Sequence, residues 1–73
     1  MADVEMIPVD SSNLSAVGYD EEQQELHVEF GGGGSTYIYS TVPPAVFEGL
    51  MTAGSKGSFL ARNVKGVYAI RRG

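Results

Sequence analysis

The clearest pattern of hydrophobic and polar positions lies at residues 25–30, where the two kinds alternate strictly. Successive side chains of a strand point to opposite faces, so the three apolar residues should line one face and the three polar residues the other. Weaker strand patterns at residues 14–19 and 36–40 predict a strand on either side. The connections have hairpin length, so the three strands should form an antiparallel meander.

After residue 41 the apolar spacing changes to that of a helix. Pro43 and Pro44 suit a first helical turn, where the N–H that proline lacks would have no partner anyway. Gly54 is placed to cap the end of this helix. The apolar residues between them fall on one stripe, which should lie on the apolar face of the sheet: Val46, Phe47, Leu50 and Met51.

A second helix is predicted after Ser55, running to about Lys65, with Gly66 as its stop. On this helix Asn63 falls among the apolar positions, where its amide should be buried and hydrogen-bonded as part of the fold. Residues 67–70 have the composition of a short closing strand.

These elements predict an α+β fold, in which a three-stranded antiparallel meander is followed by two short helices packed on one face and a short C-terminal strand. With 73 residues, the chain should form a single domain over residues 1–73, with residues 1–6 as a loose N-terminal segment. One core is expected to contain these seven residues: Leu26, Val28, Phe30, Phe47, Leu50, Phe59 and Leu60. Phe47→Ala should therefore cost roughly 3 to 5 kcal/mol.

Composition excludes several classes of protein. The chain has no cysteine, which rules out a disulfide scaffold, a thiol nucleophile and a cysteine-ligated metal site. Its first residues carry acid where a signal peptide carries base, and no apolar run approaches the roughly 20 residues of a membrane span. We therefore expect a cytoplasmic protein without membrane contact, as a monomer in preference to an oligomer.

Charge is distributed unevenly along the chain. All nine acidic residues lie within residues 1–48 and all five basic residues follow, so segments of −9 and +5 sum to the net charge of −4. The bases could bind phosphate, or the two oppositely charged segments could simply attract each other within the fold. A candidate nucleic-acid site comprises Lys56, Arg62, Lys65, Tyr68, Arg71 and Arg72. Arg62 and Lys65 should point away from the core.

Tyr37 and Tyr39 are two residues apart on a predicted strand, so they project from the same face. Such a pair could stack two bases, as aromatic residues on a sheet do in RNA-binding domains. Alternatively, both rings pack under the helices with their hydroxyls at the edge.

No catalytic residue, metal site or cofactor is expected. The only histidine, His27, lies between Glu25 and Glu29 on the polar face of its strand. Same-face neighbours on a strand are about 7 Å apart and no fourth ligand is evident, so a solvated sheet face is favoured over a metal site. The four glycines at 31–34 lack the lysine of a phosphate loop and precede a strand, which favours a flexible hairpin tip.

Taken in order, the motifs resemble those of the KTSC domain family, over about Met6 to Arg72. The residues that carry the resemblance are Ser11-Ser12, Val17-Gly18-Tyr19-Asp20, Leu26-x-Val28-x-Phe30, Tyr37-x-Tyr39, Val42-Pro43, Ser55-x-Gly57-x-Phe59 and Asn63-Val64. The four glycines and Ile38 depart from the commoner pattern. The family is named for a C-terminal extension of some lysyl-tRNA synthetases and also occurs as stand-alone bacterial and phage proteins. The resemblance implies an unresolved function for which RNA binding has been proposed.

These features together indicate a small non-enzymatic binding module. It would bind RNA or tRNA weakly through the C-terminal basic patch, because the nine acids repel the same ligand at long range. The alternative is a protein–protein interaction module that uses a strand edge or the acidic sheet face of Glu25, His27 and Glu29.

Overall fold

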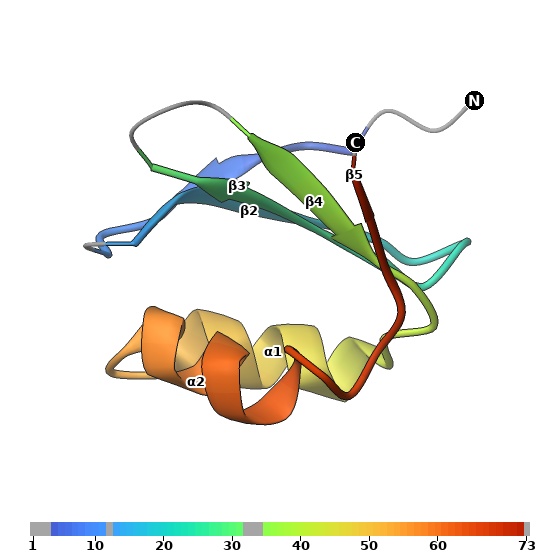
Figure 1. The fold of residues 1–73 in the computed structure, drawn as a ribbon. Coiled ribbons are helices and arrows are strands. Elements are labelled where there is room, and N and C mark those ends of the chain that lie inside the picture. Colours follow the sequence, from blue (N-terminus) through green and yellow to red (C-terminus); the bar gives the residue numbers. More distant parts are fainter. Residues whose placement is uncertain (1–3, 12, 32–34, 73) are drawn as a thin grey trace.

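A five-stranded antiparallel sheet forms one layer of the molecule, and two helices form the other (Figure 1). The computed structural model describes residues 4–11, 13–31 and 35–72. The strands lie side by side in chain order: β1 (Ile7–Pro8), β2 (Leu14–Asp20), β3 (Glu25–Phe30), β4 (Thr36–Tyr39) and β5 (Ile70–Arg72). The helices are α1 (Pro44–Thr52) and α2 (Lys56–Asn63). The predicted α+β class is confirmed, although four strands rather than three precede the helices.

Two short strands at the edges of the sheet differ from the sequence-based prediction. β1 was missed, because two residues are too few to show alternation and one of them is Pro8. The closing strand was placed wrongly at residues 67–70. The chain still turns there, with the Tyr68 N–H donating to the Val64 carbonyl at 3.2 Å, so β5 begins only at Ile70.

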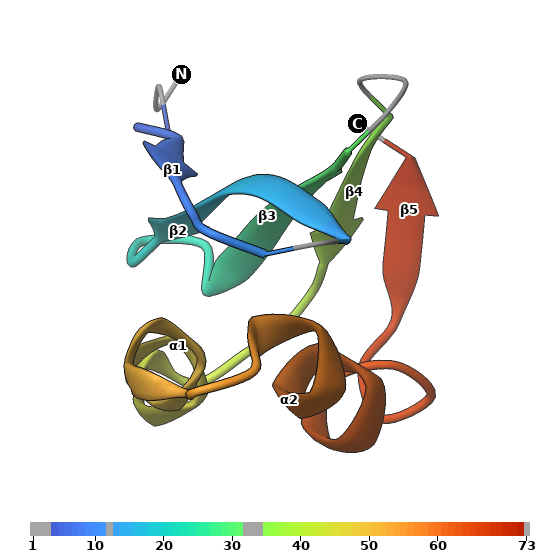
Figure 2. The ribbon, with the colours of Figure 1, turned by 90° about the vertical axis from the view of Figure 1, so that its left-hand side faces the viewer.

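The core lies between the sheet and the two helices. α1 lies under the β1–β2 side and α2 under the β4–β5 side (Figure 2). The Phe47 ring of α1 stacks on Tyr19 of β2, with 5.2 Å between ring centroids. The predicted core is confirmed, with its three phenylalanines partly rather than fully buried. The fully buried side chains are Leu14, Val17, Leu26, Val28, Tyr39, Val42, Leu50, Leu60 and Val64.

Both prolines act as predicted at the start of α1, with Pro43 as the N-cap and Pro44 as the first helical residue. The predicted cap at Gly54 is wrong. α1 ends at Thr52, and its C-cap is Ala53, whose backbone is extended (φ −66°, ψ 140°) rather than left-handed.

The end of α2 explains an incorrect expectation for Asn63. This residue is exposed rather than buried, and its side-chain amide donates to the Phe59 carbonyl at 3.2 Å. Because α2 ends at Asn63, the side chain lies at the last turn of the helix and bonds back to its own backbone, four residues earlier, from the solvent side. The helix was predicted to run to about Lys65 with Gly66 as its stop, but it ends two residues earlier. Gly66 lies in the turn that follows, with a φ of +77°, a left-handed conformation that glycine adopts without strain. No helix in the described part of the chain is long and apolar enough to cross a bilayer.

The outer face of the sheet, opposite the helices, is partly covered by the N-terminal segment. A Cβ atom on Gly18 would lie 2.6 Å from Val4 Cγ1 and 2.7 Å from the Glu5 carbonyl oxygen. Residues 4–6 therefore pack against β2, whereas a loose segment was expected over residues 1–6. Residues 1–3 and most of the predicted glycine hairpin tip, residues 32–34, lie outside the described residues.

Leu50→Ala is expected to lower the free energy of unfolding by about 2 to 5 kcal/mol, because Leu50 is completely buried between helix and sheet. Urea denaturation of both proteins measures this difference. Glu48→Ala, an exposed change on the same helix, is the control and should cost less than about 0.5 kcal/mol. A similar cost for both variants would contradict the packing of α1.

Gly18→Ala is expected to lower the free energy of unfolding by about 1 to 3 kcal/mol, because the added methyl group overlaps the backbone of residue 5. In a chain that lacks residues 1–6, the same substitution should be neutral or slightly stabilising, since the overlapping segment is gone. Equal costs in the two chains, measured by urea denaturation, would show that the N-terminal segment does not lie on Gly18.

Candidate nucleic-acid interface

α2 and β5, which carry four of the five C-terminal bases, lie on the same side of the molecule (Figure 2). β5 forms one edge of the sheet and β1 the other, so the acids on and next to β1 and β2 are kept away from the bases. Among the described residues, Arg71 is the one lysine or arginine that forms an ion pair with a carboxylate. Direct ion pairing of the basic segment with the acidic one is therefore limited, among the described residues, to Arg71 and Glu25.

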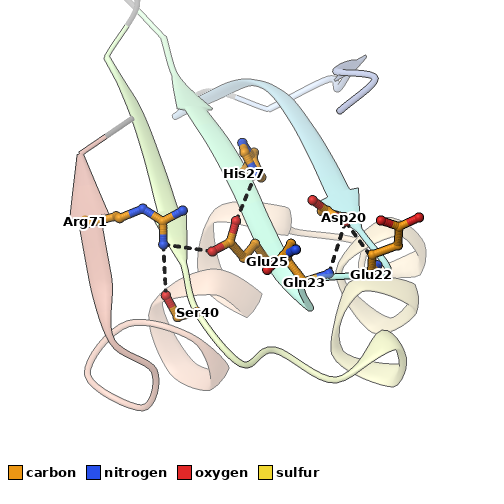
Figure 3. A network of polar contacts seen from close by, with 7 residues as sticks. All are labelled: Asp20, Glu22, Gln23, Glu25, His27, Ser40 and Arg71. Atoms are coloured by element: carbon orange, nitrogen blue, oxygen red, sulfur yellow. Dashed lines mark hydrogen bonds and ion pairs between the residues drawn. The ribbon is translucent and has the colours of Figure 1, made fainter. Parts of the chain in front are cut away.

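Arg71 lies on the outer face of the sheet, where its guanidinium spans from β5 to β3 across β4 (Figure 3). Its Nη1 is 2.8 Å from Glu25 Oε2 and also donates to Ser40 Oγ at 3.3 Å. The hydrogen bond to Glu25 raises the pKa of Arg71. Arg71 is thus separated from its neighbour Arg72, and the single basic patch predicted from sequence is divided between two faces.

Arg72 and Lys65 lie on the helix side of the sheet. Arg72 pairs directly with Tyr37 in the β4–β5 register, and directly opposed residues share a face. The Lys65 Nζ lies over the Phe30 ring, 5.4 Å from its centroid, in the range of a cation–π interaction. Lys65 was predicted to point away from the core as part of a longer helix. Because α2 ends before it, its side chain turns to the end of β3 instead.

The other predicted site residues are more dispersed. Arg62 is exposed on α2, whereas Lys56 is half-buried at the first turn and its Nζ donates to the Ala53 carbonyl at 3.3 Å. Tyr68 is half-buried in the turn between α2 and β5 and packs against the core. The structure therefore brings Lys65, Arg72 and Tyr37 together but leaves Lys56 and Tyr68 engaged with the fold.

Two hollows open near the end of β3, and both are lined by Phe30 and Lys65. The first, called here the tyrosine hollow, has a volume of about 340 Å³ and is lined by Phe30, Tyr37, Tyr39, Lys65 and Ile70. The second, the asparagine hollow, has a volume of about 380 Å³ and is lined by Asn13, Leu14, Phe30, Gly31, Gly57, Leu60, Ala61 and Lys65.

Tyr37 and Tyr39 both face the helices, and they differ in accessibility. Tyr37 is half-buried, with its ring edge-on to Phe30 at a centroid distance of 5.5 Å. Tyr39 is only 1% exposed. The prediction that both rings stack bases is therefore wrong, and Tyr39 packs under the helices, as the alternative prediction expected. Burial raises the pKa of the Tyr39 hydroxyl above 10.0, and the nearby Tyr37 raises it further. The Tyr39 hydroxyl is buried without a hydrogen-bond partner among the described residues.

The polar face of β3 is half-buried rather than fully solvated. The Nε2 of His27 is 4.0 Å from Glu25 Oε1 and has no hydrogen-bond partner among the described residues (Figure 3). Glu29 accepts a hydrogen bond from Ser15 at 3.2 Å. Within the described part of the chain, no group of three or more His, Asp or Glu side chains is placed to hold a metal ion.

Sequence reasoning did not single out three residues that line the hollows. Phe30 was expected only as a core residue, and neither Ile70 nor Asn13 carried a recognisable signal. Ile70 becomes part of the site because β5 starts later than predicted. Asn13 enters because α2 approaches the turn before β2, with the Asn13 Nδ2 atom 3.1 Å from the position of a Cβ on Gly57.

A five-stranded antiparallel sheet with two helices against one face, and a basic rim at β5, defines a small α+β domain. The KTSC domain model matches residues 10–68. The chain belongs to the KTSC domain family.

Three similar proteins illustrate the range of this family. The structure of a KTSC domain protein from Yersinia pestis superposes with a TM-score of 0.90 at 34% identity, over 96% of this chain and 97% of that one. A protein of Tsukamurella paurometabola is 48% identical over 60 residues, which cover 82% of this chain and 88% of the relative. A lysine–tRNA ligase of Nostoc punctiforme is 35% identical over 63 residues, 86% of this chain but 11% of the ligase.

Stability is expected to fall as pH rises above about 10, because the pKa values of Tyr19 and Tyr39 are raised in the folded state. Above its ordinary pKa the unfolded tyrosine releases a proton that the folded one still holds, so increasing pH favours unfolding. Urea midpoints between about pH 8 and pH 11 measure the decline. Tyr39→Phe should make it shallower, and an unchanged slope would contradict the burial of this hydroxyl.

Proposed function

We propose that this domain is a non-enzymatic accessory module that binds single-stranded RNA weakly through the basic side chains on and between α2 and β5. The observation that carries the proposal is the rim where exposed Lys65 and Arg72 adjoin the aromatic side chains of Phe30 and Tyr37. Cationic groups bind phosphate and aromatic rings stack bases, which is the combination that single-strand binding requires.

The distribution of charge supports the proposal despite the net charge of −4. Lys56, Arg62, Lys65 and Arg72 form no ion pair with a carboxylate among the described residues. Because exposed charges farther apart than about 10 Å are screened at ordinary salt, acids at the far edge of the sheet oppose phosphate binding only weakly.

The relatives supply a second support. A lysine–tRNA ligase contains a segment similar to this domain, and the substrate that its name gives is an RNA. By this analogy, RNA or tRNA is the first partner to test.

A protein-interaction module is the second candidate, and the β5 edge favours it. No strand of the described residues pairs with the outer side of β5, and Ile70 and Val67 are 52% and 60% exposed. An edge strand of this kind can pair with an extended peptide. The acidic face of β3 supports this candidate less, because Glu25 is already paired with Arg71.

If three or four bases contact one RNA strand, the salt slope should be about −2 to −3, so doubling the salt should weaken binding about four- to eightfold. Arg72→Gln should reduce the magnitude of the slope by about 0.7, whereas Arg71→Gln, whose side chain already pairs with Glu25, should change it less. Backbone-amide NMR titrations with a short RNA, with tRNA and with an unrelated acidic polymer measure these quantities.

Shifts clustered at residues 56–72 that are larger for RNA than for the acidic polymer would support RNA binding. Equal shifts with every polyanion, or none at low salt, would remove RNA as a specific partner. A shallow salt slope with a peptide ligand would favour the protein-interaction candidate instead.

A further inference from the structure

The Tyr39 side chain ends in a hydroxyl group without a hydrogen-bond partner among the described residues. The ring packs in the core, and the residue is only 1% exposed. An unsatisfied buried hydroxyl costs free energy, and native structures keep few of them. Because Tyr39 also lines the tyrosine hollow, a ligand that enters this hollow could provide the missing partner.

The other walls of the tyrosine hollow suit a flat ring. Phe30 and Tyr37 meet edge-to-face at a centroid distance of 5.5 Å, and the 52% exposed side chain of Ile70 contributes an apolar surface. A nucleobase is planar, stacks on aromatic rings and carries hydrogen-bond acceptors on its edge. The hollow therefore offers both the stacking surface and the hydrogen-bond donor that a base needs.

Lys65 can bind the negatively charged phosphate that accompanies a base in a nucleotide. It lines both hollows and is exposed, so its side chain can move aside from the Phe30 ring and still reach an adjoining phosphate. Arg72 lies next to Tyr37 in the sheet and adds a second cation at the same rim. Neither side chain forms an ion pair among the described residues.

We propose that the tyrosine hollow binds one base of single-stranded RNA, with the Tyr39 hydroxyl donating to the edge of the base and Lys65 contacting its phosphate. The inference rests on the RNA-binding function proposed above and specifies which part of the RNA is recognised. In this site the hydroxyl of Tyr39 contacts the base, whereas the ring of Tyr39 remains part of the core.

The test compares two fluorescent probes by anisotropy at low salt: a short oligouridylate and a sugar-phosphate chain of the same length without bases. The oligouridylate should bind about tenfold more tightly, since stacking and the bond to Tyr39 require a base. Tyr39→Phe removes only the hydroxyl and should weaken oligouridylate severalfold while leaving the base-free chain unchanged. Its melting temperature should not fall, because the lost group has no hydrogen-bond partner among the described residues.

Lys65→Gln should weaken both probes, and by more than Arg62→Gln does, because Arg62 does not line either hollow. Tyr37→Leu is a second variant at the wall of the hollow, and it should reduce the preference for the probe with bases. Equal binding of the two probes, or an unchanged preference in both tyrosine variants, would overturn the base site and leave phosphate-driven RNA binding in place. Failure of both probes to bind would overturn the RNA-binding function together with the site.

Discussion

The register of β3, β4 and β5 is the constraint on which the rest of the structure depends. Pairing of Tyr39 with Leu26 on one side and Ile70 on the other places these side chains together beneath the sheet. The same pairing leaves Arg71 on the outer face, opposite the helices, within reach of Glu25. A slip of one residue would exchange the two faces, because side chains along a strand alternate with a period of two.

The limited length of α2 leaves room for the hollows at one side of this core. α2 ends at Asn63, and the left-handed Gly66 turns the chain away before β5 begins at Ile70. Lys65 therefore lies beyond the helix and over the ring of Phe30. A longer helix would have directed this lysine to solvent, so the end of α2 determines both the opening of the site and its charge.

The candidate site could be predicted only in part from the sequence. The division of charge between the two halves of the chain was visible, because it depends on order alone. Which of these bases can bind a ligand depended on the pairing of the strands. Arg71 forms an ion pair with Glu25, whereas Arg72 remains on the helix side of the sheet. Tyr37 and Tyr39 were expected on one face, yet the degree to which the helices cover each ring follows from packing between distant segments.

The sequence by itself determined the elements whose signals are local, such as the alternating strand of residues 25–30 and the helix that begins at Pro44. Strand alternation and the fixed φ of proline act within a few residues, so they can be recognised without a fold. Only the tertiary structure decided the strand of residues 7–8, the exposure of Asn63 and the burial of the Tyr39 hydroxyl, which has no hydrogen-bond partner in the described part of the chain. Each of these depends on which backbone or side chain another element brings into contact, and local periodicity does not contain that information.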